Sequence, residues 1–134
     1  EEEMAEYIVS RKDWSFASVE MGVNAVERRK GITLEEFERR IDRFTKVLAE
    51  DPRPVFATSI FGFNDIDQER AENMRRIVRK YAAERLIYSD GLQILNNPCY
   101  ISADLVHPSV QGQQQIAKRW SRVMEEYRKN ECIE

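Results

Sequence analysis

Short apolar runs alternate with amphipathic segments along this chain, and the alternation constrains the fold more than any other feature. The apolar runs cover residues 16–21, 55–61 and 86–88. The amphipathic segments cover residues 1–12, 33–50, 67–85 and 110–127. Apolar residues three and four apart predict helices with one buried face, whereas short apolar runs between them are typical of buried strands. Strands that alternate with helices favour right-handed crossovers, so the sequence predicts an α/β domain with a parallel sheet.

Capping and breaking residues mark the limits of the long helices. Thr33, followed by Glu36, has the spacing of a capping box. The two prolines within residues 52–54 are expected to end that helix. Ser109 is a candidate N-cap for the last helix, whose polar tail from Arg128 onward is expected to fray.

The composition limits the classes of function. A chain of 134 residues with 42% hydrophobic and 34% charged residues fits one globular domain. The formal net charge of -3 argues against nucleic acid as a partner. No apolar run is long enough to span a membrane. Cys99 and Cys132 form no metal-binding pattern, so we expect no metal and no cofactor, and two isolated thiols favour a reducing, cytoplasmic compartment.

The single histidine lies in the stretch from Ser102 to Gly112, which leads into the last predicted helix. Histidine has the unperturbed pKa nearest neutrality and is the usual general base. Asp104 precedes His107 by three residues and could orient the imidazole. A lone histidine is more often a surface or packing residue, so this pattern needs support from the rest of the chain.

The block Asp104-Leu105-Val106-His107-Pro108, followed by Gly112, resembles the C-terminal block of the SGNH, or GDSL-type, hydrolases. The resemblance implies a serine esterase or acylhydrolase that cleaves carboxylic esters. It assigns His107 as the general base and Asp104 as the carboxylate that supports it.

A second block, Gly22-Val23-Asn24, follows the first predicted strand and resembles the Gly-x-Asn block of the same family. The carboxyl ends of parallel strands share one edge of the sheet, so this block and His107 are expected to lie on the same rim. The resemblance implies that the Asn24 amide donates to the oxyanion, with Gly22 and Val23 beside the substrate. An ordinary turn at a strand end is the alternative for this tripeptide taken alone.

Gly62-Phe63-Asn64-Asp65 matches the usual spelling of the Gly-x-Asn block better but follows the middle strand. Only one strand and one helix separate it from His107, whereas the family pattern has two such steps. We therefore assign the oxyanion role to Asn24 and expect Asn64 to be either an ordinary loop residue or one that faces the substrate.

The Gly-Asp-Ser block that carries the nucleophile in this family is absent from the sequence. We therefore expect residues 1–134 to be a single, partial domain. The resemblance implies a flavodoxin-like three-layer α/β/α fold that lacks its first two strands. The strand at 16–21 would then have a bare apolar edge, which we expect the N-terminal segment of the same protein or a second copy to cover.

Two other interpretations remain open. The chain could be a non-catalytic α/β binding or structural module that keeps a hydrolase-like rim without a nucleophile. The function of a flavodoxin-like or response-regulator-like domain, as distinct from the shared fold, is disfavoured. The chain lacks the acidic cluster and the phosphate-binding loop expected for those domains.

Overall fold

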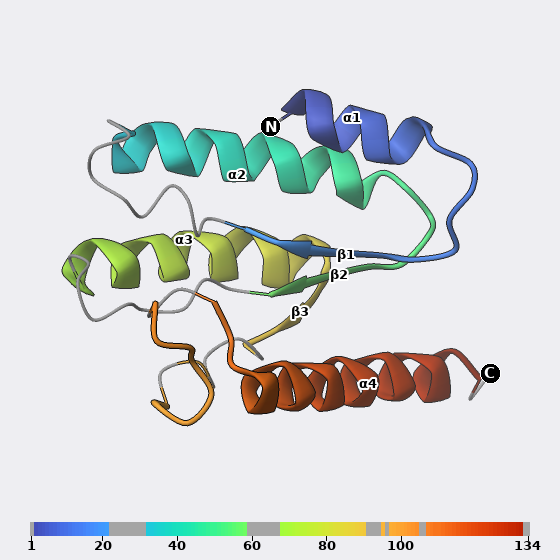
Figure 1. The fold of residues 1–134 in the computed structure, drawn as a ribbon. Coiled ribbons are helices and arrows are strands. Elements are labelled where there is room, and N and C mark those ends of the chain that lie inside the picture. The colour runs from blue at the N-terminus through green and yellow to red at the C-terminus, as the bar shows by residue number, and fades with distance from the viewer. Residues whose placement is uncertain are drawn as a thin grey trace.

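The described residues form a parallel three-stranded sheet with helices on both faces (Figure 1). The computed structural model describes residues 2–21, 32–58, 68–90, 95, 97–104 and 107–132. The helices are α1 (Glu2–Ser10), α2 (Leu34–Ala49), α3 (Gln68–Arg85) and α4 (Val110–Cys132). The strands are β1 (Ala17–Glu20), β2 (Val55–Thr58) and β3 (Ile87–Ser89). The α/β class and the parallel sheet predicted from the sequence are confirmed.

The strand order β1-β2-β3 follows the order of the chain, and both pairs are parallel. Because both crossovers move along the sheet in the same direction, the right-handed rule places α2 and α3 on the same face. Helix α1 packs beside α2 on that face, and α4 covers the other face (Figure 1). The predicted three layers are therefore present.

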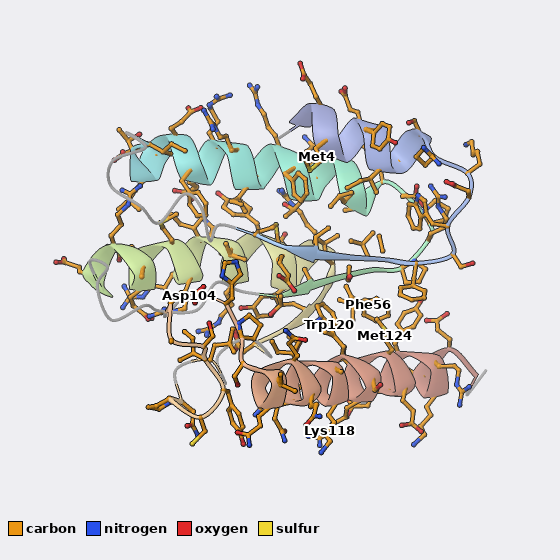
Figure 2. The ribbon with its side chains drawn as sticks, viewed as in Figure 1. Met4, Phe56, Asp104, Lys118, Trp120 and Met124 are labelled. Atoms are coloured by element: carbon orange, nitrogen blue, oxygen red, sulfur yellow. The ribbon has the colours of Figure 1, made fainter. Side chains whose placement is uncertain are left out.

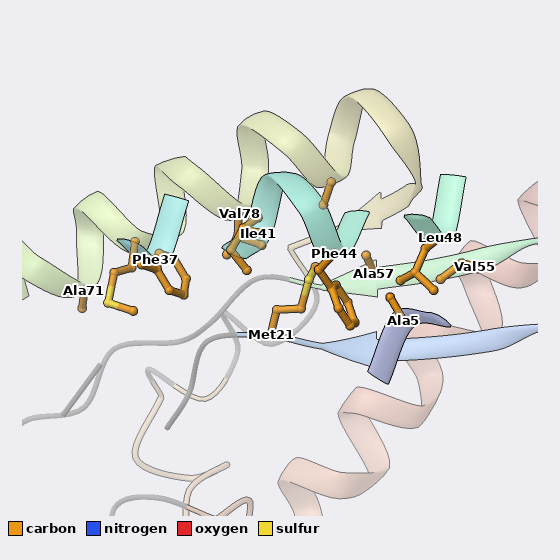
Figure 3. Close-up of a cluster of buried hydrophobic side chains, with 12 residues drawn as sticks. Ala5, Met21, Phe37, Ile41, Phe44, Leu48, Val55, Ala57, Ala71 and Val78 are labelled. Carbon is orange, nitrogen blue, oxygen red and sulfur yellow. The ribbon is translucent and has the colours of Figure 1, made fainter. Parts of the chain in front are cut away.

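The main core lies between the sheet and the helices α1, α2 and α3. Alternate residues of β2 point into it, with Val55 and Ala57 both buried (Figure 3). Helix α2 contributes Phe37, Ile41 and Leu48 at helical spacing, as the sequence pattern predicted. The Thr33 side chain accepts a hydrogen bond from the Glu36 N–H at 3.1 Å, which confirms the predicted N-cap.

The opposite layer is built around Phe56, whose ring is 2% exposed. It makes edge-to-face contacts with Phe16, Trp120 and Tyr127 at centroid distances of 6.0, 6.2 and 5.7 Å. Figure 2 shows Phe56, Trp120 and Met124 together between the sheet and α4. This ring cluster fixes the position of α4 on the sheet.

Two predictions about individual segments are wrong. The tail from Arg128 remains helical, and α4 ends only at Cys132. The first strand is not a buried strand, since Ser18 and Glu20 are exposed and Phe16 is 51% exposed. The reason is position: among the described strands β1 pairs only with β2, and α4 covers the middle strand rather than β1.

Candidate functional site

The segment that carries His107 is closed by backbone hydrogen bonds. The Ser102 N–H donates to the His107 carbonyl at 2.8 Å, and the Ser109 N–H donates to the Tyr100 carbonyl at 3.0 Å. An isolated antiparallel bridge joins Ile101 to Pro108 between these two bonds. These contacts tie both sides of the segment together at the start of α4.

Asp104 and His107 are in direct contact, as their spacing predicted. Asp104 Oδ2 lies 2.6 Å from His107 Nδ1, and Oδ1 accepts the backbone N–H of His107 at 2.9 Å. A carboxylate only accepts hydrogen bonds, so the Nδ1 that faces it must carry the proton. The side chains of His107 and Asp104 are 77% and 51% exposed, so the pair lies at the surface.

The first turn of α4 is joined to this segment through Ser109 and Gly112. The Ser109 hydroxyl accepts the Gly112 N–H at 3.0 Å and donates to the Cys99 carbonyl at 3.0 Å, which confirms the predicted N-cap. A Cβ atom on Gly112 would lie 1.9 Å from the Tyr100 carbonyl oxygen. Only glycine therefore allows α4 to approach the Asp104–His107 segment this closely.

A row of polar residues crosses the sheet at the carboxyl ends of the three strands. Glu20 pairs with Thr58 and Thr58 pairs with Ser89, on the face that carries Phe56. The Thr58 side chain is 1% exposed, and its hydroxyl has no hydrogen-bond partner among the residues that the structure describes. No local pattern in the sequence marks Thr58, because its burial depends on the packing of segments far apart in the chain.

Charged groups next to this row belong to the end of β3. Asp90 accepts hydrogen bonds from the Tyr88 hydroxyl at 2.5 Å and from Arg79 at 3.3 Å. The pKa of Arg79 is raised, mainly by its hydrogen bond with Tyr88 and to a smaller extent by the charge of Asp90. The guanidinium therefore stays charged at the edge of the rim.

The other predicted site residues, Gly22, Val23, Asn24 and Asn64, lie outside the described residues. Within the described ranges, no serine hydroxyl is hydrogen-bonded to the His107 ring. No group of three metal-ligating side chains occurs in the part of the chain that the structure describes. None of the described helices is long and apolar enough to cross a membrane.

The fold resembles those of two solved structures. It superposes on the crystal structure of TesA with a TM-score of 0.73 and 11% identity, covering 93% of this chain and 70% of that chain. It superposes on LAE5, an alpha/beta hydrolase enzyme from the metagenome of Lake Arreo, Spain, with a TM-score of 0.66 and 19% identity. That match covers 81% of this chain and 59% of LAE5. No family model matches the chain, and no curated protein matches its sequence.

Proposed function

We propose that this chain is the part of a serine esterase that carries the general base and its supporting carboxylate. The observation that carries the proposal is the Asp104–His107 pair, with 2.6 Å between Oδ2 and Nδ1, on the segment that leads into α4. The Asp-x-x-His-Pro spelling and the hydrolase-like α/β fold shared with LAE5 support it. A carboxylic ester is the proposed substrate.

In the proposed reaction His107 Nε2 takes the proton of a serine hydroxyl as the serine oxygen attacks the ester carbonyl. Asp104 stabilises the imidazolium through Nδ1–H, and the Asn24 amide would donate to the oxyanion of the tetrahedral intermediate. The intermediate then breaks its bond to the alkoxy group, which leaves as an alcohol with the proton from His107. Water repeats the two steps on the acyl-enzyme and releases the acid.

The serine of this proposal belongs to a segment that covers β1. The open side of β1 supports the idea, since Ser18 and Glu20 are exposed and Phe16 is 51% exposed. The 77% exposure of His107 supports it as well, because a general base works best in a site from which water is excluded. The N-terminal segment of the same protein is the first candidate, and a second copy of the chain is the alternative.

A non-catalytic binding or structural module is the second candidate function. It is favoured by the lack of any hydrogen bond between a described serine and the His107 ring. In that case the hydrolase-like rim would remain while the chemistry is lost.

Ester hydrolysis by the protein extended upstream of Glu1 tests the proposal, with 4-nitrophenyl acetate as the probe. We expect His107→Ala to lower kcat/KM by about 10²–10⁴-fold, the usual share of general acid–base catalysis. Lys118→Ala is the control, because Lys118 points away from the sheet on α4 (Figure 2). Unchanged hydrolysis in His107→Ala would refute the assignment of the base.

The 134-residue chain alone provides a second test. We expect no labelling of this chain by a fluorophosphonate probe, because the reactive serine is proposed to lie elsewhere. Labelling that depends on His107 would place the nucleophile inside the chain and contradict the proposed covering segment. Absence of hydrolysis in the extended protein, with the fold intact, would favour the non-catalytic module.

A further inference from the structure

Ser102 makes contacts that the assignment of base and carboxylate leaves without a role. Its hydroxyl donates to Asp104 Oδ1 at 2.6 Å, and its backbone N–H donates to the His107 carbonyl at 2.8 Å. The same Oδ1 also accepts the backbone N–H of His107 at 2.9 Å. Ser102 therefore contacts both the carboxylate and the residue that the carboxylate orients.

We propose that Ser102 is a positioning residue that fixes the Asp104 carboxylate and, through it, the ring tautomer of His107. The terminal torsion of an aspartate is broad, so a carboxylate needs fixed donors to keep one oxygen aimed at a ring. The Ser102 hydroxyl and the His107 N–H both donate to Oδ1, which helps to meet this need and leaves Oδ2 facing Nδ1. The neutral ring then carries its proton on Nδ1 and presents Nε2 as an acceptor.

The exposure of the pair makes the additional donor important. Water competes for hydrogen bonds at a surface pair, and exposed ion pairs are weak on their own. His107 and Asp104 are 77% and 51% exposed, whereas Ser102 is half-buried. A hydrogen bond to a charged acceptor changes an equilibrium by about tenfold or more, so the Ser102 hydroxyl can hold a geometry that the exposed pair would not hold alone.

This inference rests on the proposed function, because a general base needs an unprotonated Nε2 in its resting state. The ring tautomer of His107 can be measured without catalysis. A chain with the predicted tautomer and no esterase activity in the extended protein would refute the proposed function and leave the role of Ser102 standing.

The ring tautomer can be read directly by NMR, because His107 is the only histidine in the chain. Long-range ¹H–¹⁵N correlation of the ¹⁵N-labelled 134-residue chain, in alkaline buffer, assigns the ring proton to Nδ1 or Nε2. We expect the Nδ1–H tautomer in the unmodified chain. Ser102→Ala should lower the ratio of Nδ1–H to Nε2–H several-fold, whereas Ser102→Thr, which keeps the hydroxyl, should preserve it.

Ser109→Ala is the matched control, because Ser109 lies in the same segment but donates to the Cys99 carbonyl instead of to Asp104. It should leave the tautomer ratio unchanged, and backbone amide spectra of each variant report whether the segment stays folded. If Ser102→Ala does not fold, Ser102→Cys, which offers a weaker donor of similar size, should give an intermediate ratio. The proposal would be overturned if the tautomer ratio of Ser102→Ala or Ser102→Cys equalled that of the unmodified chain. It would also be overturned if Ser109→Ala shifted the ratio as much as Ser102→Ala does.

Discussion

Replacement of Phe56 by alanine tests whether one side chain carries most of the contact between α4 and the sheet. The ring is 2% exposed and makes edge-to-face contacts with Phe16, Trp120 and Tyr127. Truncation of a buried phenylalanine costs about 3–5 kcal/mol, and each edge-to-face pair adds about 0.5–1.5 kcal/mol beyond burial. We therefore expect a loss at the upper end, about 4–5 kcal/mol of the free energy of unfolding.

Urea denaturation, followed by tryptophan fluorescence and circular dichroism, measures this loss. A domain of this size has a total stability of about 5–15 kcal/mol, so Phe56→Leu should be prepared as a milder variant with a smaller loss. Phe44→Ala is the control, because Phe44 is 8% exposed and lies on α2 in the other layer. Hydrogen exchange should show faster opening of α4 in the Phe56 variants but not selectively in Phe44→Ala.

Two results would refute the reasoning. A loss below about 1 kcal/mol in Phe56→Ala would mean that the ring cluster is not a packed core, since core truncations cost more than this. Unchanged exchange in α4, together with faster exchange in α2, would mean that Phe56 stabilises the other layer.

Three further predictions concern single residues. Gly112→Ala should lower the free energy of unfolding by about 1–3 kcal/mol in urea denaturation, because the new Cβ would meet the Tyr100 carbonyl oxygen at 1.9 Å; higher stability would contradict that close approach. Thr58→Val should raise the free energy of unfolding by about 1 kcal/mol, because it removes a buried hydroxyl that has no partner among the described residues. A clear loss of stability would show that the hydroxyl is hydrogen-bonded in solution. The Arg53 hydrogen bond lowers the pKa of Asp51 from 3.8 to about 2. The stability that this lowered pKa contributes is fully present above about pH 4 and is lost as the pH falls through about 2. Between pH 4 and 2 the Tm of the unmodified chain should therefore fall more than the Tm of Asp51→Asn. Equal falls in Tm would refute the link between this pKa and stability.

Local signals in the sequence predicted those features whose causes are local. Thr33 caps α2 because the Glu36 N–H lies within one turn of it, and Ser109 caps α4 in the same way. The contact between Asp104 and His107 also depends on a spacing of three residues within one short segment. In each case the interacting groups are so close in sequence that residue type and spacing are sufficient.

The two wrong predictions, the frayed end of α4 and the buried first strand, concern interactions between distant segments. The polar residues after Arg128 indicated fraying, but Tyr127, one residue earlier, packs on Phe56 of the sheet and anchors the helix near its end. The apolar run that forms β1 predicted a buried strand, whereas Ser18 and Glu20 are exposed. That outcome depends on how strands from separate parts of the chain pair.

The Ser102 contact and the burial of the Thr58 hydroxyl were not predicted, for different reasons. The former requires the backbone to close between residues 102 and 107. The latter requires β1 and β3, which come from separate parts of the chain, to pair on either side of β2, as expected for contacts that are non-local in sequence. The first feature depends on the closure of one short segment, and the second depends on how complete strands come together.

The Asp104–His107 pair is exposed, so the question is why its geometry is held in place. Exposed ion pairs contribute little to stability, because water screens them and ordering two side chains costs entropy. The pair is nevertheless held by the Ser102 hydroxyl, by the His107 N–H and by a backbone closure, in a segment joined to α4 through a close approach at Gly112. Stability therefore does not account for this arrangement. Transfer of a proton at Nε2, in a site that a further segment completes, would account for both the fixed geometry and the open surface around it.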